Sequence, residues 1–229
     1  MEGDFHQILD LTSRYLRQQR ELYGEEIFLS SPEKRILSRL SPGNSWELDE
    51  FYHSIQDCQK CELARRRTHL VFGSGNPRAK LMLVGEAPGQ EEDVQGEPFV
   101  GPAGQLLNKI LKAINFDRSE VYVANVLKCR PPDNREPLPE EIQRCGPFLL
   151  KQIDLIRPKV ILALGRIAAQ ALLNTTQSLG ELRGKVHAYK GVPVIVTYHP
   201  AALLRHPEWK RGTWEDVQMV QKIYDQTNG

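Results

Sequence analysis

The chain has 229 residues, of which 40% are hydrophobic and 26% are charged, enough for one sizeable core and an appendage. Its 30 basic and 29 acidic residues give a net charge of +1. That balance neither requires nor excludes a nucleic-acid partner, because phosphate binding depends on local clusters of charge. No apolar run approaches the roughly 18 residues of a membrane span, and residues 1–4 are acidic where a secretory signal would be basic. We therefore expect a cytoplasmic protein without membrane contact.

The beginning of the chain differs in composition from the rest. Apolar residues at helical spacing predict a helix over about residues 3–23, and residues 30–45 carry the Ser, Pro and Gly typical of a linker. We expect residues 1–45 to form a helical extension and linker, and residues 46–229 to form the main domain.

From residue 80 onward, short apolar or β-branched runs alternate with amphipathic runs. This alternation is typical of right-handed βαβ units, in which helices cover both faces of a parallel sheet. We expect an α/β fold, a three-layer α/β/α sandwich with a central, mainly parallel, four-stranded sheet. The predicted strands are residues 81–84, 121–124, 160–164 and 192–197.

Amphipathic runs outside these strands predict the helices. The runs lie at residues 48–55, 106–114 and 142–156 and after Gly165. Thr213, with Asp216 three positions later, resembles a capping box, which predicts that the last helix begins there.

Polar segments follow three of the four predicted strands. Residues 85–89 leave the first strand, Asn125 ends the second, and residues 198–200 leave the fourth. In open α/β sheets, ligands bind at the carboxyl ends of the strands. We therefore expect these three segments to meet at one edge of the sheet and to form a binding site.

The four cysteines are Cys58, Cys61, Cys129 and Cys145. The first two form a C-x₂-C pair, whose tight turn brings two sulphur atoms to one side of a metal. Because thiols stay reduced in the cytosol, we interpret the four as a metal centre rather than as disulfides or buried free thiols. Four thiolates suit either Zn²⁺ or an iron–sulphur cluster, and their spacing does not separate the two.

Several short motifs occur together in this chain. Gly-Glu-Ala-Pro-Gly-Gln-Glu-Glu-Asp occupies residues 85–93, and His-Pro-Ala-Ala-Leu-Leu-Arg occupies residues 199–205. Together with the four cysteines and with residues 96–104 and 125–132, they resemble the family 4, or iron–sulphur, uracil-DNA glycosylases over about residues 51–225. Each string alone is weak evidence, but five in the right order over this length are specific.

The resemblance implies a uracil-DNA glycosylase fold and a DNA-repair activity. Such an enzyme flips uracil out of single- or double-stranded DNA and hydrolyses its N-glycosidic bond, leaving an abasic site. The resemblance implies a structural [4Fe-4S] cluster rather than zinc, bound by Cys58, Cys61, Cys129 and Cys145. We expect a monomer, whose N-terminal extension is a candidate contact for a repair partner.

The resemblance also implies which residues contact the base. Asn125 would recognise uracil, because an amide accepts from N3–H and donates to O4, whereas cytosine presents the opposite pair. Phe99 would stack on the uracil ring. His199 would donate a hydrogen bond to O2 and stabilise the departing anion, for which a neutral imidazole suffices.

Three residues of the first motif are assigned further roles. Glu86 would orient water or stabilise the cationic sugar, and Glu92 would line the C5 side of the base and exclude the methyl group of thymine. Ala87 adjoins the base at the place where better-known uracil glycosylases carry the aspartate of a Gly-Gln-Asp-Pro-Tyr motif. Because alanine cannot replace that aspartate chemically, Glu86 is the favoured acid.

The second motif and the residues after it are expected to contact DNA. Leu203 or Leu204 would fill the gap left by the flipped base as an apolar wedge. Arg205, Lys210 and Arg211 would meet phosphates, as would a second basic cluster at residues 65–67.

Other functions remain as alternatives. Because of Ala87, the protein is alternatively a non-catalytic module that binds uracil or single-stranded DNA. Covalent trapping of DNA by a histidine in an inserted loop is disfavoured, because no long insertion separates Gly101 from Leu106. A zinc-stabilised nucleotide hydrolase is a third alternative.

Overall fold

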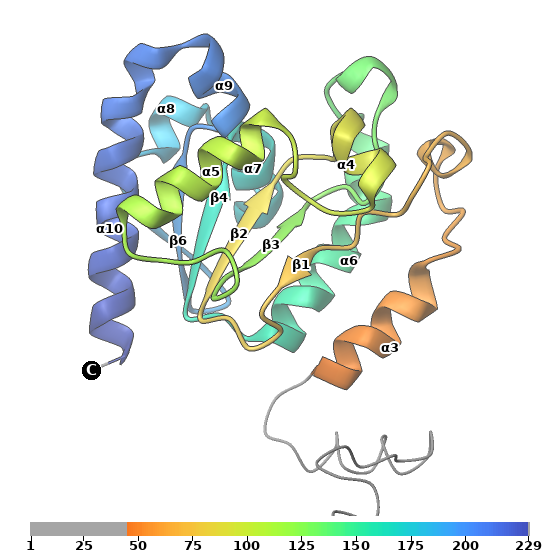
Figure 1. Cartoon of the computed structure of the whole chain (residues 1–229), viewed down its shortest axis with the longest axis horizontal. Helices are drawn as coiled ribbons and strands as arrows, with labels where there is room; N and C mark the ends of the chain where they lie inside the picture. The colour runs from red at the N-terminus through yellow and green to blue at the C-terminus, as the bar shows by residue number, and fades with distance from the viewer. Residues whose placement is uncertain (1–44, 229) are drawn as a thin grey trace, which may run out of the picture. The chain divides into compact units, whose positions relative to one another are not determined.

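A six-stranded sheet forms the centre of the computed structural model, which describes residues 45–228 (Figure 1). The predicted helix over residues 3–23 and nearly all of the predicted linker lie outside the described residues. The strands follow one another in space in the order β1-β3-β2-β4-β6-β5. Their bounds are β1 Ser74–Gly75, β2 Leu81–Gly85, β3 Tyr122–Asn125, β4 Val160–Leu164, β5 Val186–Tyr189 and β6 Val192–Thr197.

The four predicted strands are confirmed as the parallel centre of this sheet. β3, β2, β4 and β6 pair in parallel, and β2, β3 and β4 are buried along their whole length. Strands that are covered on both faces consist of continuous apolar runs, and for this reason the four strands could be predicted from the sequence. The prediction of four strands was incomplete, because β1 and β5 add one antiparallel strand at each edge.

Helices cover both faces of the sheet, and the predicted three-layer fold is confirmed (Figure 1). On one face, α5 and α10 pack against alternate strand residues such as Leu81 and Leu83. On the other face, α3, α6 and α7 pack against the intervening residues, such as Met82 and Val84. These helices are α3 Ser45–Ile55, α5 Pro102–Ala113, α6 Pro139–Ile156, α7 Arg166–Leu173 and α10 Lys210–Asn228.

Short helices occupy the connections between these elements. They are η1 Glu62–Arg65, α4 Gln90–Gln95, η2 Pro132–Asn134, α8 Leu179–Leu182, α9 Pro200–Arg205 and η3 Pro207–Trp209. α4 and α9 follow β2 and β6 respectively, and both lie at the carboxyl edge of the sheet (Figure 1). Among the described residues, no helix has the length and apolar character to cross a membrane.

The predicted start of the last helix was wrong. α10 begins at Lys210, so Thr213 lies inside the helix, where its hydroxyl donates to the carbonyl of Trp209 at 3.2 Å. Asp216 does not cap the helix either, because it is buried and pairs with Arg183. The two residues that resembled a capping box are therefore occupied by other contacts.

Candidate active site

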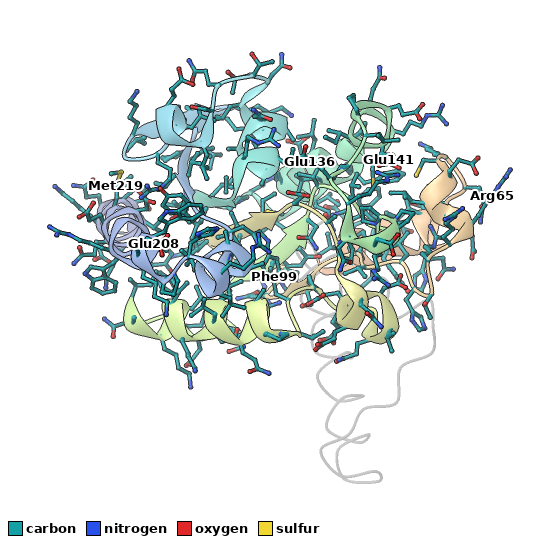
Figure 2. All side chains as sticks on the ribbon, turned by 90° about the horizontal axis from the view of Figure 1, so that it is seen from above. Arg65, Phe99, Glu136, Glu141, Glu208 and Met219 are labelled. Atoms are coloured by element: carbon teal, nitrogen blue, oxygen red, sulfur yellow. The ribbon has the colours of Figure 1, made fainter. Side chains whose placement is uncertain are left out.

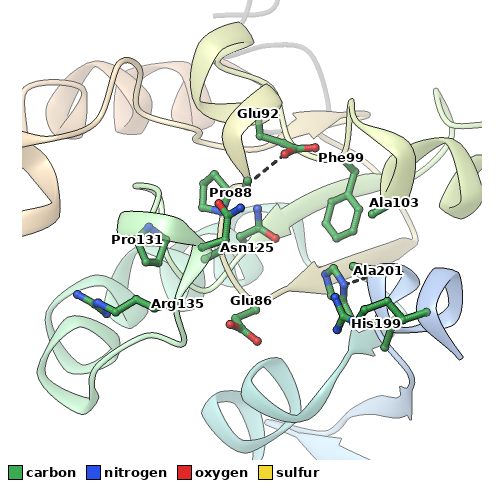
Figure 3. A pocket seen from close by; sticks show the side chains of 15 residues that line it. Glu86, Pro88, Glu92, Phe99, Ala103, Asn125, Pro131, Arg135, His199 and Ala201 are labelled. Carbon is green, nitrogen blue, oxygen red and sulfur yellow. Dashed lines mark hydrogen bonds between the residues drawn. The ribbon is translucent and has the colours of Figure 1, made fainter.

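A cavity of about 350 Å³ opens at the carboxyl edge of the sheet (Figure 3). The three polar segments that we expected to meet there do so: Glu86, Asn125 and His199 all line this cavity. Figure 3 shows Phe99 and His199 close together on one side, and Arg135 and its loop on the opposite side. Its size and its mixed polar and apolar wall suit a small planar ligand.

Asn125 brings a buried amide to the cavity from the end of β3. Its side chain is 2% exposed, and its Oδ1 atom has no hydrogen-bond partner within residues 45–228. Asn125 pairs with Gly85 across the sheet, and a Cβ atom at Gly85 would lie 2.3 Å from Oδ1 and 2.7 Å from the Phe99 ring. A buried polar atom without a partner is costly, so this amide is arranged for a ligand that supplies the missing hydrogen bond.

Phe99 is held in a backbone conformation that bulky residues rarely adopt. Its φ angle is 58°, in the left-handed region. α5 packs directly against its backbone, since a Cβ atom at Gly104 would lie only 1.8 Å from the Phe99 carbonyl oxygen. The ring is thereby directed at the cavity, with its centroid 5.4 Å from that of the His199 ring.

Glu92 fixes the loop that carries Phe99. One carboxylate oxygen accepts from the backbone N–H groups of Val100 and Gly101 at 3.0 Å, and the other accepts from Gly89 at 3.1 Å. The side chain also lines the cavity. Glu92 therefore braces both walls of the site in addition to presenting its carboxylate to a ligand.

His199 forms the N-cap of α9 and is neutral at physiological pH. Its Nδ1 atom accepts from the backbone N–H of Ala201 at 3.2 Å, so the ring hydrogen resides on Nε2. Burial and the positive charge of Arg205 lower the pKa of His199 to about 4, against an opposing effect of Glu92. The site thus contains an imidazole donor without a permanent charge.

Glu86 is half-buried and lines the cavity just beyond β2. Burial raises the pKa of its carboxyl group, and the nearby Glu136 raises it further, whereas Arg166 opposes the shift. Glu136 and Arg166 form an ion pair with each other. Ala87, next to Glu86, also lines the cavity and contributes no titratable group.

The two leucines of the second motif have different environments. Leu203 is 1% exposed and lines an apolar groove with residues of α5 and α10, whereas Leu204 is 49% exposed. Of the two wedge candidates, only Leu204 is exposed to solvent. The expectation for Leu203 is corrected: it anchors α9, because its side chain is taken up by the core.

The predicted phosphate contacts lie around the same edge. Arg205 lines the cavity, and Lys210 and Arg211 are exposed at the start of α10. Figure 2 looks down on this edge and shows Glu208, beside the start of α10, at one end and Arg65 toward the other, with Phe99 between them. The candidate DNA surface therefore extends on both sides of the cavity.

One wall of the cavity was not predicted. Pro131, Asn134 and Arg135 line it from the loop after Cys129, and both guanidinium nitrogens of Arg135 bond to the buried carboxylate of Glu141. The signal in the sequence was the Arg-Pro-Pro-Asp-Asn-Arg string that follows Cys129, of which only the first three residues belong to the motif at residues 125–132.

The four cysteines come together at a separate, small cavity, with Cys129 and Cys145 buried and Cys58 and Cys61 half-buried. Two N–H groups point at their sulphur atoms: Arg67 donates to Cys129 Sγ at 3.3 Å, and the backbone of Lys128 donates to Cys145 Sγ at 3.2 Å. Such bonds suit thiolate ligands of a metal group. Within the described residues, no group of three or more metal-binding side chains forms a site for a single ion.

Arg67 was expected at a phosphate, and this expectation is corrected. Besides Cys129, its guanidinium bonds to the carbonyl oxygens of Cys58 and Gln56 at 3.0 and 2.7 Å. The neighbouring Arg65 and Arg66 are exposed. Arg67 therefore bonds to the loop that carries Cys58 and Cys61 and does not face outward. Of the basic cluster, only Arg65 and Arg66 do.

A buried lysine links the cysteines to Asn125. Lys128 is fully buried and donates from Nζ to the backbone carbonyl of Asn125 at 2.8 Å and to Gln152 at 2.6 Å. Its own backbone N–H bonds to Cys145. The backbone that presents Asn125 is thus fixed from the cysteine side of the molecule.

Comparison with known proteins gives the class to which this fold and cavity belong. Residues 72–221 match the model of the uracil DNA glycosylase superfamily, and the chain belongs to that superfamily. Within it, the chain is a member of the type-4 uracil-DNA glycosylase family. It is 44% identical to the type-4 uracil-DNA glycosylase of Archaeoglobus fulgidus, over 77% of this chain and 92% of that protein.

Two further relatives, one of type 4 and one of type 5, are also similar to this chain. The type-4 uracil-DNA glycosylase of Thermotoga maritima is 44% identical, over 74% of this chain and 90% of its own length. The type-5 uracil-DNA glycosylase of Pyrobaculum aerophilum is 29% identical, over 73% of this chain and 88% of its own length.

Proposed function

We propose that this protein removes uracil from DNA by flipping the nucleotide into the cavity and hydrolysing its N-glycosidic bond, leaving an abasic site. The proposal rests above all on the buried Asn125 amide, whose Oδ1 atom lacks a partner within residues 45–228 while lining the cavity. The membership in the glycosylase superfamily supports it independently.

Recognition of the base follows from the hydrogen-bonding groups in the cavity. The Asn125 amide accepts from uracil N3–H and donates to O4, and cytosine presents the opposite pattern. Phe99 offers a flat face on which the flipped base stacks. A site built to pair with buried polar groups rejects a base that leaves them unpaired.

Cleavage builds negative charge on the uracil and positive charge on the sugar. Nε2–H of His199 donates to O2 of the departing base, and its lowered pKa keeps the ring neutral, so that the donor needs no counter-charge. Glu86, when ionised, stabilises the cationic sugar or orients the attacking water. Because Ala87 supplies no acid, Glu86 carries this role alone among residues 85–89.

A [4Fe-4S] cluster held by Cys58, Cys61, Cys129 and Cys145 fits the cysteine cavity, because four sulphur atoms line it and two N–H groups point at them. When bound, the cluster would cross-link the three chain segments that carry these cysteines. The backbone contacts of Lys128 then hold Asn125 in place. No chemical step requires the metal group.

The metal group can be tested directly on anaerobically purified protein. We expect a brown solution with visible absorbance and bound iron, and we expect Cys145→Ser to lose both and to unfold at a lower temperature. Metal analysis by mass spectrometry together with thermal unfolding measures these quantities. A colourless wild-type protein that contains zinc would contradict the cluster and would support the zinc-stabilised alternative.

The activity can be tested with an oligonucleotide that contains a single uracil. Incubation with the protein followed by alkali should cleave the strand at the uracil, and Asn125→Asp should lower kcat/KM by at least about 100-fold. The substitution replaces the amide donor by an acceptor and puts a negative charge beside the departing anion.

The same assay separates the enzyme from the non-catalytic alternative, which remains because of Ala87. A protein that binds the uracil-containing oligonucleotide but yields no alkali-sensitive product would be a binding module. Oligonucleotides that contain thymine or cytosine in place of uracil serve as controls. Cleavage of cytosine-containing DNA by Asn125→Asp, but not by the wild type, would show directly that this amide selects the base.

A further inference from the structure

Four side chains stack on one another at the ends of the segment that carries Leu204. They belong to Arg183, Tyr198, Trp209 and His206. The Tyr198 and Trp209 rings stack with centroids 4.7 Å apart, and His206 stacks on Trp209 at 4.2 Å, each pair inclined by 19°. On the far side of Tyr198, the guanidinium carbon of Arg183 lies 4.0 Å from the ring centroid. None of the four has a role in the chemistry proposed above.

This stack joins the two ends of one chain segment. Tyr198 directly follows β6, and Trp209 directly precedes α10, so the stack pins together the ends of residues 198–209. The wedge candidate Leu204 lies between them on α9, and Figure 1 shows α9 near the upper end of α10. A loop whose two ends are fixed to each other has far fewer conformations available than a loop with free ends.

The stack is itself fixed to the core. Arg183 bonds through two nitrogens to the carboxylate of Asp216, at 2.8 and 2.7 Å, and Asp216 is 1% exposed. α10 makes room for this arginine at Gly212, where a Cβ atom would lie 2.6 Å from the guanidinium. Both nitrogens contact the same oxygen, Oδ2, and such charge-assisted hydrogen bonds are stronger than those between neutral groups.

We propose that Trp209 is a positioning residue that holds α9 so that the exposed Leu204 is ready to enter the gap left by a flipped nucleotide. It is the only member of the stack with aromatic partners on both faces, and Leu203 anchors the helix from the opposite side. This inference rests on the proposed function, because the wedge matters only if a base is flipped.

The inference predicts a difference between substrates. In a duplex, the flipped nucleotide leaves a gap between its stacked neighbours, opposite the partner base, and a wedge must fill this gap. Uracil in a single strand leaves no such gap. We expect Trp209→Ala to lower the single-turnover excision rate on duplex DNA by about tenfold, the effect of losing one to two aromatic contacts. On single-stranded DNA, we expect a change of less than about twofold.

Two variants provide the controls. Trp209→Phe retains an aromatic ring and should restore most of the duplex activity. Val186→Ala removes an exposed apolar side chain of β5 that takes no part in the stack, and it should excise uracil from both substrates like the wild type. Extrusion is followed separately by the fluorescence of 2-aminopurine placed beside the uracil, which rises when the neighbouring base leaves the stack.

The outcomes distinguish the two proposals. Equal losses on both substrates for Trp209→Ala, no loss on either, or a duplex-specific loss in Val186→Ala would overturn the positioning role. Failure of Trp209→Phe to recover would overturn stacking as its cause. If the wild type excises no uracil at all, the proposed function fails, and the 2-aminopurine signal still shows whether Trp209 controls extrusion.

Discussion

At the scale of single residues, the cavity combines groups whose ordinary behaviour is changed by burial. Asn125 has a buried oxygen without a hydrogen-bond partner among residues 45–228, His199 is kept neutral, and the pKa of Glu86 is raised. Displaced pKa values in a cavity are typical of functional sites. The pKa of His199 is lowered and that of Glu86 is raised, and both groups line the same cavity.

The pH dependence of excision should therefore reflect Glu86. His199 remains neutral down to a pKa of about 4, whereas Glu86 is protonated as the pH falls through a pKa above the ordinary 4.5. The role proposed for Glu86 requires its ionised form, so kcat/KM should decline on the acid side at a pH higher than that of a free carboxylate. Measuring kcat/KM from pH 4 to 8 gives the position of this decline.

A variant of the neighbouring charge provides the test of this assignment. Glu136 raises the pKa of Glu86, and Arg166, its ion-pair partner, lowers it. Glu136→Gln removes the repulsion and frees the arginine, so the acid-side decline should move to lower pH. An unchanged decline in Glu136→Gln, or one that persists in Glu86→Gln, would assign it to another group.

At the scale of elements, close backbone contact positions the aromatic platform. α5 approaches the loop of Phe99 so nearly that Gly104 has no room for a side chain, and Glu92 holds the same loop through two N–H groups. The strained φ of Phe99 persists because these contacts enclose it on both sides.

Gly104→Ala should therefore damage both the fold and the site. Its Cβ atom would lie 1.8 Å from the Phe99 carbonyl oxygen and 2.2 Å from the carbonyl carbon, so α5 or the loop must move. We expect a loss of about 1–3 kcal/mol in the free energy of unfolding and strongly reduced excision. Denaturant unfolding and the alkali assay measure these effects.

Gly180→Ala is the matched control. Gly180 also lies in a helix, α8, but a Cβ atom there meets nothing within 4 Å. The added methyl group should leave excision unchanged and should stabilise the protein slightly, by about 0.4–1 kcal/mol, since alanine restricts the unfolded chain. Equal effects of the two substitutions would mean that the contact with Phe99 is not tight.

The sequence predicted the elements whose signal is local and missed those that depend on distant partners. Continuous apolar runs located the four parallel strands. β1 was missed because it has only two residues, and β5 because its burial alternates between exposed and half-buried. The start of α10 was misplaced because Asp216 pairs with Arg183, 33 positions earlier, and no local pattern reports such a contact.

The candidate site was predictable in its location but not in its contacts. Residues after parallel strands meet at one edge for topological reasons, so Glu86, Asn125 and His199 could be grouped from the sequence. Which leucine faces outward could not be inferred, because Leu203 and Leu204 are adjacent and equally apolar. Arg67 looked like surface charge, and only the fold reveals that it bonds to Cys129.

At the scale of the whole molecule, a nearly neutral protein presents its positive charge unevenly. Arg205 lines the cavity, Lys210 and Arg211 are exposed at the start of α10, and exposed Arg65 and Arg66 follow the first cysteine pair. This uneven distribution explains how a net charge of +1 is compatible with a polyanionic substrate.

Binding of DNA should weaken as salt increases, because phosphate contacts release counterions. The double substitution Lys210→Ala and Arg211→Ala removes two exposed cations beside the cavity. It should reduce the slope of log affinity against log salt concentration by about 2. Fluorescence anisotropy with a uracil-containing duplex at several salt concentrations measures this slope.

Lys80→Ala with Lys159→Ala is the control for that experiment. Both lysines are exposed, and they lie just before β2 and β4, at the opposite edge of the sheet from the cavity. The net charge changes by the same amount, so a local contact predicts an unchanged slope. If both double variants reduce the slope equally, binding depends on total charge and not on the surface around α9.

The tight turn between β5 and β6 is a suitable place for inserting a foreign sequence. Lys190 and Gly191 both adopt left-handed backbone angles there, in a two-residue hairpin that precedes β6. The six residues of β6 separate this hairpin from the segment that begins at Tyr198, a span of about 20 Å. A fluorescent reporter or an affinity tag inserted into the hairpin should therefore not obstruct the access of DNA to the cavity.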